Sequence, residues 1–184
     1  MDTAKLKEDL LKTIKEKAFI RGEERTLASG KKSNFYIDGK QVTLDAHGLL
    51  LVGKTILAVL SGVKVDAIGG PTLGADPIAA AVMHQGVALG KTYDAFVVRK
   101  EPKDHGRGRQ VEGPDLQGKR VIVLEDTSTT GGSPLKAVEA LLKVGAIIAG
   151  VAVVVDRATG AREIIEAAGY PYYAAIGLED LGLA

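Results

Sequence analysis

The sequence predicts an α/β fold, an open, doubly wound and mostly parallel sheet with helices on both faces. Its strand-like segments are short continuous apolar runs, which are typical of strands covered on both faces. These runs alternate with helix-like segments along the chain, as in βαβ units. The chain has 184 residues, of which 46% are hydrophobic and 26% charged, so it is long enough to bury a substantial core. We therefore expect a single domain that spans residues 1–184.

Helical spacing of apolar residues near the N-terminus predicts an amphipathic first helix. The residues of its apolar face are Leu6, Leu10, Leu11, Ile14 and Ala18. A polar segment over residues 29–34 predicts a turn, and the run Phe35-Tyr36-Ile37 after it predicts a short strand. Asp45 is placed to cap a helix that continues to Val59.

Strands and helices alternate from residue 66 onwards. Strand-like runs are found over residues 66–70, 94–99, 120–124, 147–155 and 172–176. Asp76 and Ser133 are predicted to cap the helices after the first and third runs, each with a proline as the next residue. The second of these helices should end at Gly145, and a further helix is expected over 161–168. Ligands of such sheets bind at the carboxyl ends of the strands, so the functional site is expected there.

Composition and charge exclude several classes of protein. A net charge of +1 argues against a broad nucleic-acid surface, and the absence of cysteine excludes disulfides, a thiolate catalyst and a cysteine zinc site. No apolar run approaches the ~18 residues of a membrane span. Residues 1–17 mix lysine with glutamate and lack the apolar centre of a signal peptide. We expect a cytoplasmic protein with neither nucleic-acid nor membrane partners.

The most informative segment is the strand over 120–124 with the residues after it. Two carboxylates, Glu125 and Asp126, are followed by a loop rich in hydroxyl groups and glycine over 127–133 and then by a helix. Backbone N–H groups and a helix N-terminus bind phosphate. The carboxylates would repel phosphate, so they indicate sugar hydroxyls or a hydrated divalent cation as well. A plain strand-to-helix turn is the alternative; the loop is neither a Walker A motif nor a G-x-G-x-x-G turn.

This segment resembles the binding motif for 5-phosphoribosyl-1-pyrophosphate (PRPP) of type I phosphoribosyltransferases. The resemblance implies that the two acids hold the ribose hydroxyls and that the loop holds the 5-phosphate. It implies PRPP contacts from Glu125, Asp126, Thr127, Ser128, Thr129, Thr130, Gly131, Gly132 and Ser133.

A second segment, residues 99–109, places five cationic side chains and a histidine in eleven residues at the end of a strand. It is either a solvated surface loop or a mobile basic lid that neutralises a leaving pyrophosphate. Its string RKEPKDHG resembles the catalytic loop of orotate phosphoribosyltransferases, which reaches across a dimer interface. The resemblance implies PRPP contacts from Arg99, Lys100, Lys103 and His105. It implies catalytic roles for Lys103, His105 and Asp126.

A third feature is Arg157, which follows Asp156 at the end of the strand over 147–155. A guanidinium fork suits a planar carboxylate, although a lone arginine after a strand is more often a surface residue or a salt-bridge partner. In the orotate enzymes the matching arginine contacts the base, and the resemblance implies that Arg157 and Thr129 bind orotate. The segment 29–38 resembles the family's hood, which covers the base, and the whole hood region spans about residues 1–45.

The chain departs from the family pattern at two positions. Ala28 and Leu73 stand where we align lysines of well-known members, and Lys31, Lys32 or Lys40 are candidates to replace the first of them. Mg²⁺ is expected to arrive with the diphosphate of PRPP and to keep much of its water shell, so we expect no protein metal cage.

The resemblance implies transfer of the phosphoribosyl group from PRPP to orotate, giving orotidine 5′-monophosphate and pyrophosphate in pyrimidine biosynthesis. It also implies a homodimer with shared active sites. Alternatives are a purine phosphoribosyltransferase, and a non-catalytic or altered-specificity homologue that binds PRPP or nucleotides. A dehydrogenase-like nucleotide-binding domain is a further alternative, which the missing G-x-G-x-x-G turn disfavours.

Overall fold

A six-stranded, mostly parallel sheet forms the centre of the molecule in the computed structural model, which describes residues 2–26, 32–101 and 109–182. The strand order is β5-β4-β3-β6-β7-β8, and only the short edge strand β5 is antiparallel to its neighbour. The strands are β3 (Ala67–Pro71), β4 (Asp94–Val98), β5 (Val111–Glu112), β6 (Arg120–Ser128), β7 (Ile147–Asp156) and β8 (Tyr172–Ile176). The predicted doubly wound α/β fold is confirmed.

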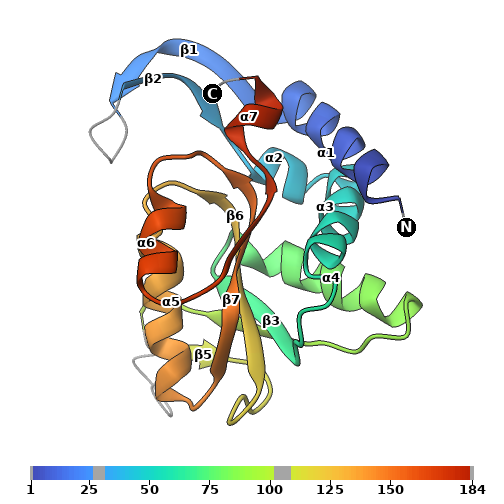
Figure 1. Ribbon diagram of the computed structural model, residues 1–184, viewed down its shortest axis with the longest axis vertical. Helices are drawn as coiled ribbons and strands as arrows, with labels where there is room; N and C mark the ends of the chain where they lie inside the picture. The colour runs from blue at the N-terminus through green and yellow to red at the C-terminus, as the bar shows by residue number, and fades with distance from the viewer. Residues whose placement is uncertain (1, 27–31, 102–108, 183–184) are drawn as a thin grey trace.

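Helices cover both faces of the sheet, and each face has its own apolar core (Figure 1). One side carries α3 (Ala46–Val59) and α4 (Ala75–Ala88), with α1 (Thr3–Lys17) packed on α3. The other side carries α5 (Gly132–Lys143) and α6 (Ala161–Ala167). Two short helices, α2 (Lys40–Thr43) and α7 (Leu178–Leu181), complete the described chain.

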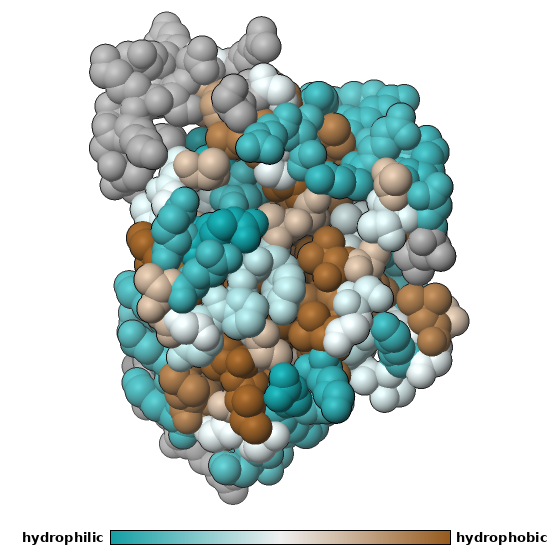
Figure 2. All heavy atoms as spheres, viewed as in Figure 1, coloured by the Kyte–Doolittle hydropathy of each residue, from teal (hydrophilic) through white to brown (hydrophobic). Residues whose placement is uncertain are grey.

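The predicted first helix is amphipathic as expected. Leu10 and Ile14 of α1 are fully buried, and the N-cap Asp2 accepts hydrogen bonds from the N–H groups of the first turn. Hydrophilic residues cover the region of α1 in the space-filling view (Figure 2). None of the described helices is both long and apolar enough to cross a membrane.

An antiparallel hairpin of β1 (Phe19–Thr26) and β2 (Lys32–Ile37) stands apart from the main sheet, and we call it the hood hairpin. It arches over one end of the sheet (Figure 1). The predicted strand at 35–37 is confirmed and is longer than expected. Residues 29–31 of the predicted turn over 29–34 lie outside the described residues, and residues 32–34 belong to β2, so the turn was wrong there. The strand β1 was not predicted at all.

The predicted helix caps are right in one case and wrong in two. Asp45 caps α3 by accepting a hydrogen bond of 2.8 Å from the Gly48 N–H. The N-cap positions of α4 and α5 are Gly74 and Gly131, and neither helix has a side-chain cap. Asp76 and Ser133 instead lie inside the first turns of these helices. Loops that end in glycine leave the helix N-terminus free of a side-chain oxygen, so its N–H groups remain available to a ligand.

The sheet has a topological switch point between β3 and β6. These two strands are neighbours in the sheet, but α4 leaves β3 on one face and α5 leaves β6 on the other. The carboxyl ends of strands at such a switch point are the general place for a ligand in these sheets.

Candidate active site

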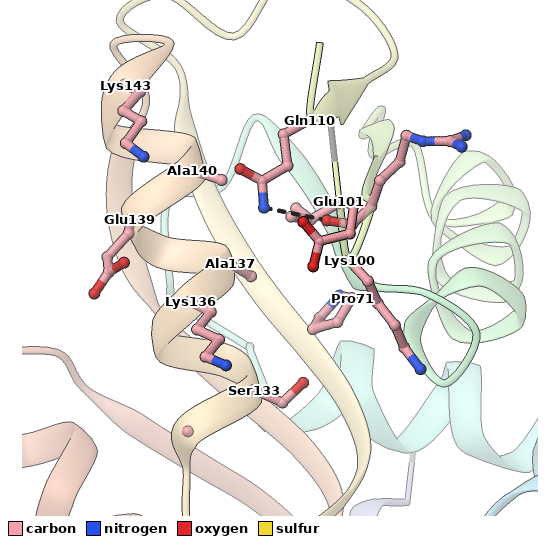
Figure 3. A pocket seen from close by; sticks show the side chains of 13 residues that line it. Pro71, Lys100, Glu101, Gln110, Ser133, Lys136, Ala137, Glu139, Ala140 and Lys143 are labelled. Carbon is pink, nitrogen blue, oxygen red and sulfur yellow. Dashed lines mark hydrogen bonds between the residues drawn. The ribbon is translucent and has the colours of Figure 1, made fainter. Parts of the chain in front are cut away.

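The carboxyl ends of β3 and β4, the residues after β4 and one face of α5 line a cavity of about 710 Å³ (Figure 3). Pro71 lines it from the end of β3, and Arg99 and Lys100 line it after β4. Gly132 and Ser133 line it from the first turn of α5. The basic segment and the last residues of the predicted phosphate loop, which the sequence singled out separately, therefore meet at one cavity, whereas the acid pair and Arg157 are not among the residues that line it.

Asp126 is the most constrained of the predicted site residues. Its side chain is only 5% exposed, and its Oδ1 accepts a hydrogen bond of 2.7 Å from the Thr127 N–H. Its Oδ2 accepts a hydrogen bond of 3.1 Å from Lys40 Nζ, at the start of α2. The carboxylate is therefore fixed in orientation and joined to the end of the hood region.

Glu125, the other carboxylate of the pair, has a shifted pKa. Burial, together with the charge of Asp126, raises the pKa of Glu125 to about 7. The Ser133 hydroxyl donates a hydrogen bond to the Glu125 carboxylate, which opposes this rise and links the acid to the first turn of α5. The charge of Glu125 therefore depends on pH near neutrality.

Two glycines let backbone segments approach the acid pair. A Cβ atom at Gly74 would lie 2.9 Å from Asp126 Oδ1 and 2.9 Å from Glu125 Oε1. A Cβ atom at Gly39 would lie 3.0 Å from the Cβ of Asp126. The β3–α4 loop and the start of α2 therefore both rest against the carboxylates, and only glycine fits without displacing them.

Of the predicted loop over 127–133 only residues 129–131 connect β6 to α5, because β6 continues to Ser128 and α5 begins at Gly132. Gly131 has a φ of +73°, a left-handed conformation that glycine adopts without strain. The Thr129 carbonyl accepts a hydrogen bond from the Thr159 hydroxyl, which fixes the loop to the β7–α6 connection. The first N–H groups of α5 have no acceptor within the helix, and together with the loop they offer an anion site.

Ser128 is placed differently from the rest of the predicted phosphate loop. It is the last residue of β6, and its buried hydroxyl contacts Tyr172 Oη at 2.6 Å and Asp156 Oδ1 at 3.3 Å. Burial of the Tyr172 hydroxyl raises its pKa further above its ordinary value. The Ser128 side chain therefore holds β6, β7 and β8 together, and only its backbone remains for a substrate.

Arg157 is buried beside the hood hairpin without an ionic partner among the described residues. Arg157 is 5% exposed, and its Nε and Nη2 atoms have no hydrogen-bond partner. Its guanidinium carbon lies 5.7 Å from the ring centre of Phe35 and 5.9 Å from that of Tyr36. Burial lowers the pKa of Arg157 below its usual value. A buried cation with free donors is costly on its own, so the arrangement indicates a site for a planar anion.

Asp156, which precedes Arg157, organises the turn after β7. Its Oδ1 accepts a hydrogen bond of 2.9 Å from the Ala158 N–H. The Arg157 N–H donates to the Ser128 carbonyl at 3.3 Å, so the arginine is fixed directly beside the start of the phosphate loop. Arg157 and Thr129, the two residues predicted to bind orotate, therefore belong to neighbouring connections.

The predicted basic lid is described only at its two ends. The Arg99 N–H donates a hydrogen bond to the Gln110 carbonyl at 2.9 Å, and the Gln110 side-chain Nε2 donates to the Arg99 carbonyl at 3.2 Å. Arg99 Nη1 lies 4.0 Å from Glu112 Oε1. Lys103 and His105 lie outside the described residues, as does Ala28. Lys136 of α5 also lines the cavity and extends from the helix beside it (Figure 3). The sequence carried no signal for it, because a lysine on the polar face of a helix is an ordinary surface residue.

Comparison with known proteins agrees with this geometry. A phosphoribosyl transferase domain model matches residues 48–168. An orotate phosphoribosyltransferase from Corynebacterium glutamicum (strain R) is 54% identical over 175 residues, which cover 95% of this chain and 93% of the relative.

Solved structures agree as well. The Mycobacterium tuberculosis H37Rv orotate phosphoribosyltransferase in complex with PRPP is 43% identical, with a TM-score of 0.81 and coverage of 97% of this chain and 99% of that one. A phosphoribosyltransferase from Corynebacterium diphtheriae is 46% identical, with a TM-score of 0.85 and the same coverage. With its switch-point cavity, acid pair and phosphate loop, the chain belongs to the orotate phosphoribosyltransferase family of the type I phosphoribosyltransferase fold.

Proposed function

We propose that the protein transfers the phosphoribosyl group of PRPP to orotate, releasing pyrophosphate and forming orotidine 5′-monophosphate, with the residues of this site in the roles given below. The single observation that carries the choice of orotate is Arg157, a buried guanidinium with unused donors beside two aromatic rings. Orotate is a flat ring with a carboxylate, whereas purine bases have no carboxylate to pair with this group. The site therefore favours orotate over the purine alternative.

Orotate would lie between the hood hairpin and the β7–α6 connection in this proposal. The Arg157 fork binds its carboxylate, and the rings of Phe35 and Tyr36 flank the base. Thr129, at the start of the phosphate loop, contacts orotate from the opposite connection. Binding of the carboxylate would remove the cost of the unpaired guanidinium, so the free energy of binding depends on this contact.

PRPP would occupy the loop after β6. The acid pair holds the ribose hydroxyls, and the loop and α5 hold the 5-phosphate. The residues assigned to the 5-phosphate are Thr127, Thr129, Thr130, Gly131, Gly132 and Ser133, with Ser128 contributing through its backbone. Support comes from the free N-terminus of α5 and from the fixed orientation of Asp126.

The diphosphate would face the end of β4 and the β3–α4 loop. Arg99 and Lys100 line the cavity there, and we assign Lys103 and His105 of the same segment to the diphosphate as well. Leu73 is 71% exposed in the β3–α4 loop and brings no charge to it. The backbone of that loop and the cations of the basic segment are therefore the groups available to the diphosphate.

Mg²⁺ is part of the proposal as a companion of PRPP. Within the described part of the chain, no group of three or more histidines and acids could hold a metal ion. The carboxylate oxygens of the acid pair are ligands that suit Mg²⁺, and Glu125 is the one not paired with a lysine. Bound with the diphosphate, the ion supplies positive charge that stabilises the leaving group.

The reaction breaks the bond between ribose C1 and the diphosphate oxygen, forms a bond between C1 and orotate N1, and releases the N1 proton of orotate to the solvent or to the leaving pyrophosphate. Positive charge develops on the ribose ring, and we assign its stabilisation to the Asp126 carboxylate. Lys103 and His105 are assigned to the departing pyrophosphate, and positioning of the two substrates supplies the remaining rate enhancement. We place the reaction in the cytoplasm and in a homodimer whose basic lids serve the neighbouring subunits.

The test is orotate consumption followed by ultraviolet absorbance, with PRPP and Mg²⁺ present and with hypoxanthine and adenine as rival acceptors. Consumption of orotate alone is the expected result. Consumption of a purine base would contradict the assignment of Arg157. Binding of PRPP by calorimetry without turnover of any of the three bases would favour the non-catalytic alternative.

A further inference from the structure

Lys40 is the cation that contacts the acid pair in the part of the chain that the structure describes. It is the first residue of α2, and its Nζ lies 3.1 Å from Asp126 Oδ2, 86 positions along the chain. The Lys40 side chain is 48% exposed, whereas the Asp126 side chain is 5% exposed. The lysine therefore reaches from the open side of the site onto a buried carboxylate.

The backbone beside Lys40 prevents it from being a loosely placed surface residue. Gly39 packs directly on the Asp126 side chain, so the start of α2 lies against the acid pair. Asp126 Oδ1 is already used by the Thr127 N–H, which leaves Oδ2 as the oxygen that faces Lys40. The β3–α4 loop touches the same carboxylate through Gly74. Lys40 thus lies where the hood region, the acid pair and this loop meet.

The charges at this point pose a problem that Lys40 solves. PRPP carries several phosphate charges, and two neighbouring carboxylates would repel them. An ammonium group on Asp126 neutralises one carboxylate without blocking the oxygen lone pairs that ribose hydroxyls need. We propose that Lys40 is a positioning residue for PRPP: its ammonium neutralises Asp126 in the empty site and faces the diphosphate when the ribose hydroxyls bind. This inference rests on the proposed function, because it assumes that PRPP is the ligand.

The competing explanation is that Lys40 only ties the hood region to the sheet. The chain offers a matched control for that role in Lys17, whose Nζ lies 2.6 Å from Asp45 Oδ1. The Lys17 side chain is 43% exposed, close to the value for Lys40, and it joins α1 to the cap of α3 away from the acid pair. Lys17→Met therefore removes a comparable ion pair without touching the proposed site.

The experiment compares the wild type with Lys40→Met, Lys40→Arg and Lys17→Met. PRPP binding with Mg²⁺ is measured by calorimetry, and the KM values for PRPP and orotate are measured separately. Lys40→Met should weaken PRPP binding roughly ten- to hundredfold, as expected for loss of a charged hydrogen bond, while the KM for orotate changes less than about twofold. Lys40→Arg should restore most of the PRPP affinity, and Lys17→Met should leave it unchanged.

Several outcomes would overturn the inference. Equal PRPP affinity in Lys40→Met and the wild type is one, and an equal rise of both KM values with a lowered Tm is another, because it indicates a structural role. The calorimetric arm needs no turnover, so a wild type that binds PRPP but ignores orotate would contradict the proposed function while still testing Lys40.

Discussion

Single residues of the site owe their properties to neighbours that are distant in the chain. Glu125 and Asp126 are adjacent in sequence, yet one is paired with Lys40 and the other has a pKa near neutrality. The sequence showed that both acids end a buried strand, so their place in the fold was predictable. The raised pKa of Glu125 could not be predicted from the sequence, because it depends on burial. The pairing of Asp126 could not be predicted either, because its lysine is contributed by the hood region.

Glu125→Gln should make the protein more stable at alkaline pH relative to the wild type. The pKa of Glu125 rises from 4.5 to about 7 on folding, so the folded state binds a proton more tightly than the unfolded state. The wild type keeps its full stability below about pH 4.5 and loses some as the pH rises towards 7; the loss amounts to about 3 kcal/mol. Glutamine does not ionise and escapes this loss.

The free energy of unfolding is measured by denaturant titration at pH 5 and pH 8 for both proteins. The advantage of Glu125→Gln should grow between these two values. Glu139→Gln, a change at an exposed position of α5, serves as the control and should show no such growth. An advantage that is the same at both pH values would mean that Glu125 is already ionised at pH 5.

Among the elements, the loops at the carboxyl ends of β3 and β6 determine the shape of the site. The strands and long helices were predicted because their apolar periodicity is strong. The strand β1 was missed because its residues are mostly charged or polar, and β5 was missed because it has only two residues. The caps at Asp76 and Ser133 were wrong because the N-cap residues of the two helices are glycines, Gly74 and Gly131, two positions earlier.

Gly74→Ala tests whether the β3–α4 loop must lie against the acid pair. The added Cβ would meet oxygens of both carboxylates at 2.9 Å, so they must shift. Because Gly74 has a φ of −63°, alanine fits the backbone itself, and the Tm should change little. A displacement of catalytic groups should lower kcat/KM for PRPP roughly tenfold or more.

The control for this change is Gly22→Ala in β1, where a Cβ would meet nothing within 4 Å. It should behave as the wild type in the same steady-state assay. Full activity of Gly74→Ala would show that the loop yields without disturbing the acid pair.

The whole molecule combines a sheet that the sequence predicts well with a hood that it predicts only in part. Continuous apolar runs and their crossovers determine the doubly wound sheet, and the switch point between β3 and β6 follows from the strand order. The contact of Arg157 with Phe35 and Tyr36 depends instead on how the hood hairpin folds over the sheet. No local pattern specifies that long-range packing.

The shared active site of the proposed dimer can be tested by subunit mixing. Lys103→Ala and Asp126→Ala should each be inactive alone, because one damages the lid and the other the sugar site. Mixed and allowed to exchange, they should recover up to about a quarter of wild-type activity, since half of the dimers are mixed and each holds one intact site.

Mixing Asp126→Ala with Arg157→Met is the control, because each change damages the site in the body of its own subunit and a mixed dimer therefore holds no intact site. If exchange is shown by mass spectrometry and the first pair still recovers nothing, the lid acts within its own subunit.

The most direct measurement is the effect of Arg157→Met on the two KM values, with Arg162→Met as the control. Arg162 is an exposed arginine of α6 that pairs with Glu166. Loss of the Arg157 fork should raise the KM for orotate roughly a hundredfold and change the KM for PRPP less than about threefold, while Arg162→Met should leave the KM for orotate near the wild-type value. An orotate KM that stays unchanged in Arg157→Met, or rises only in step with the PRPP KM, would show that this buried guanidinium does not bind the orotate carboxylate.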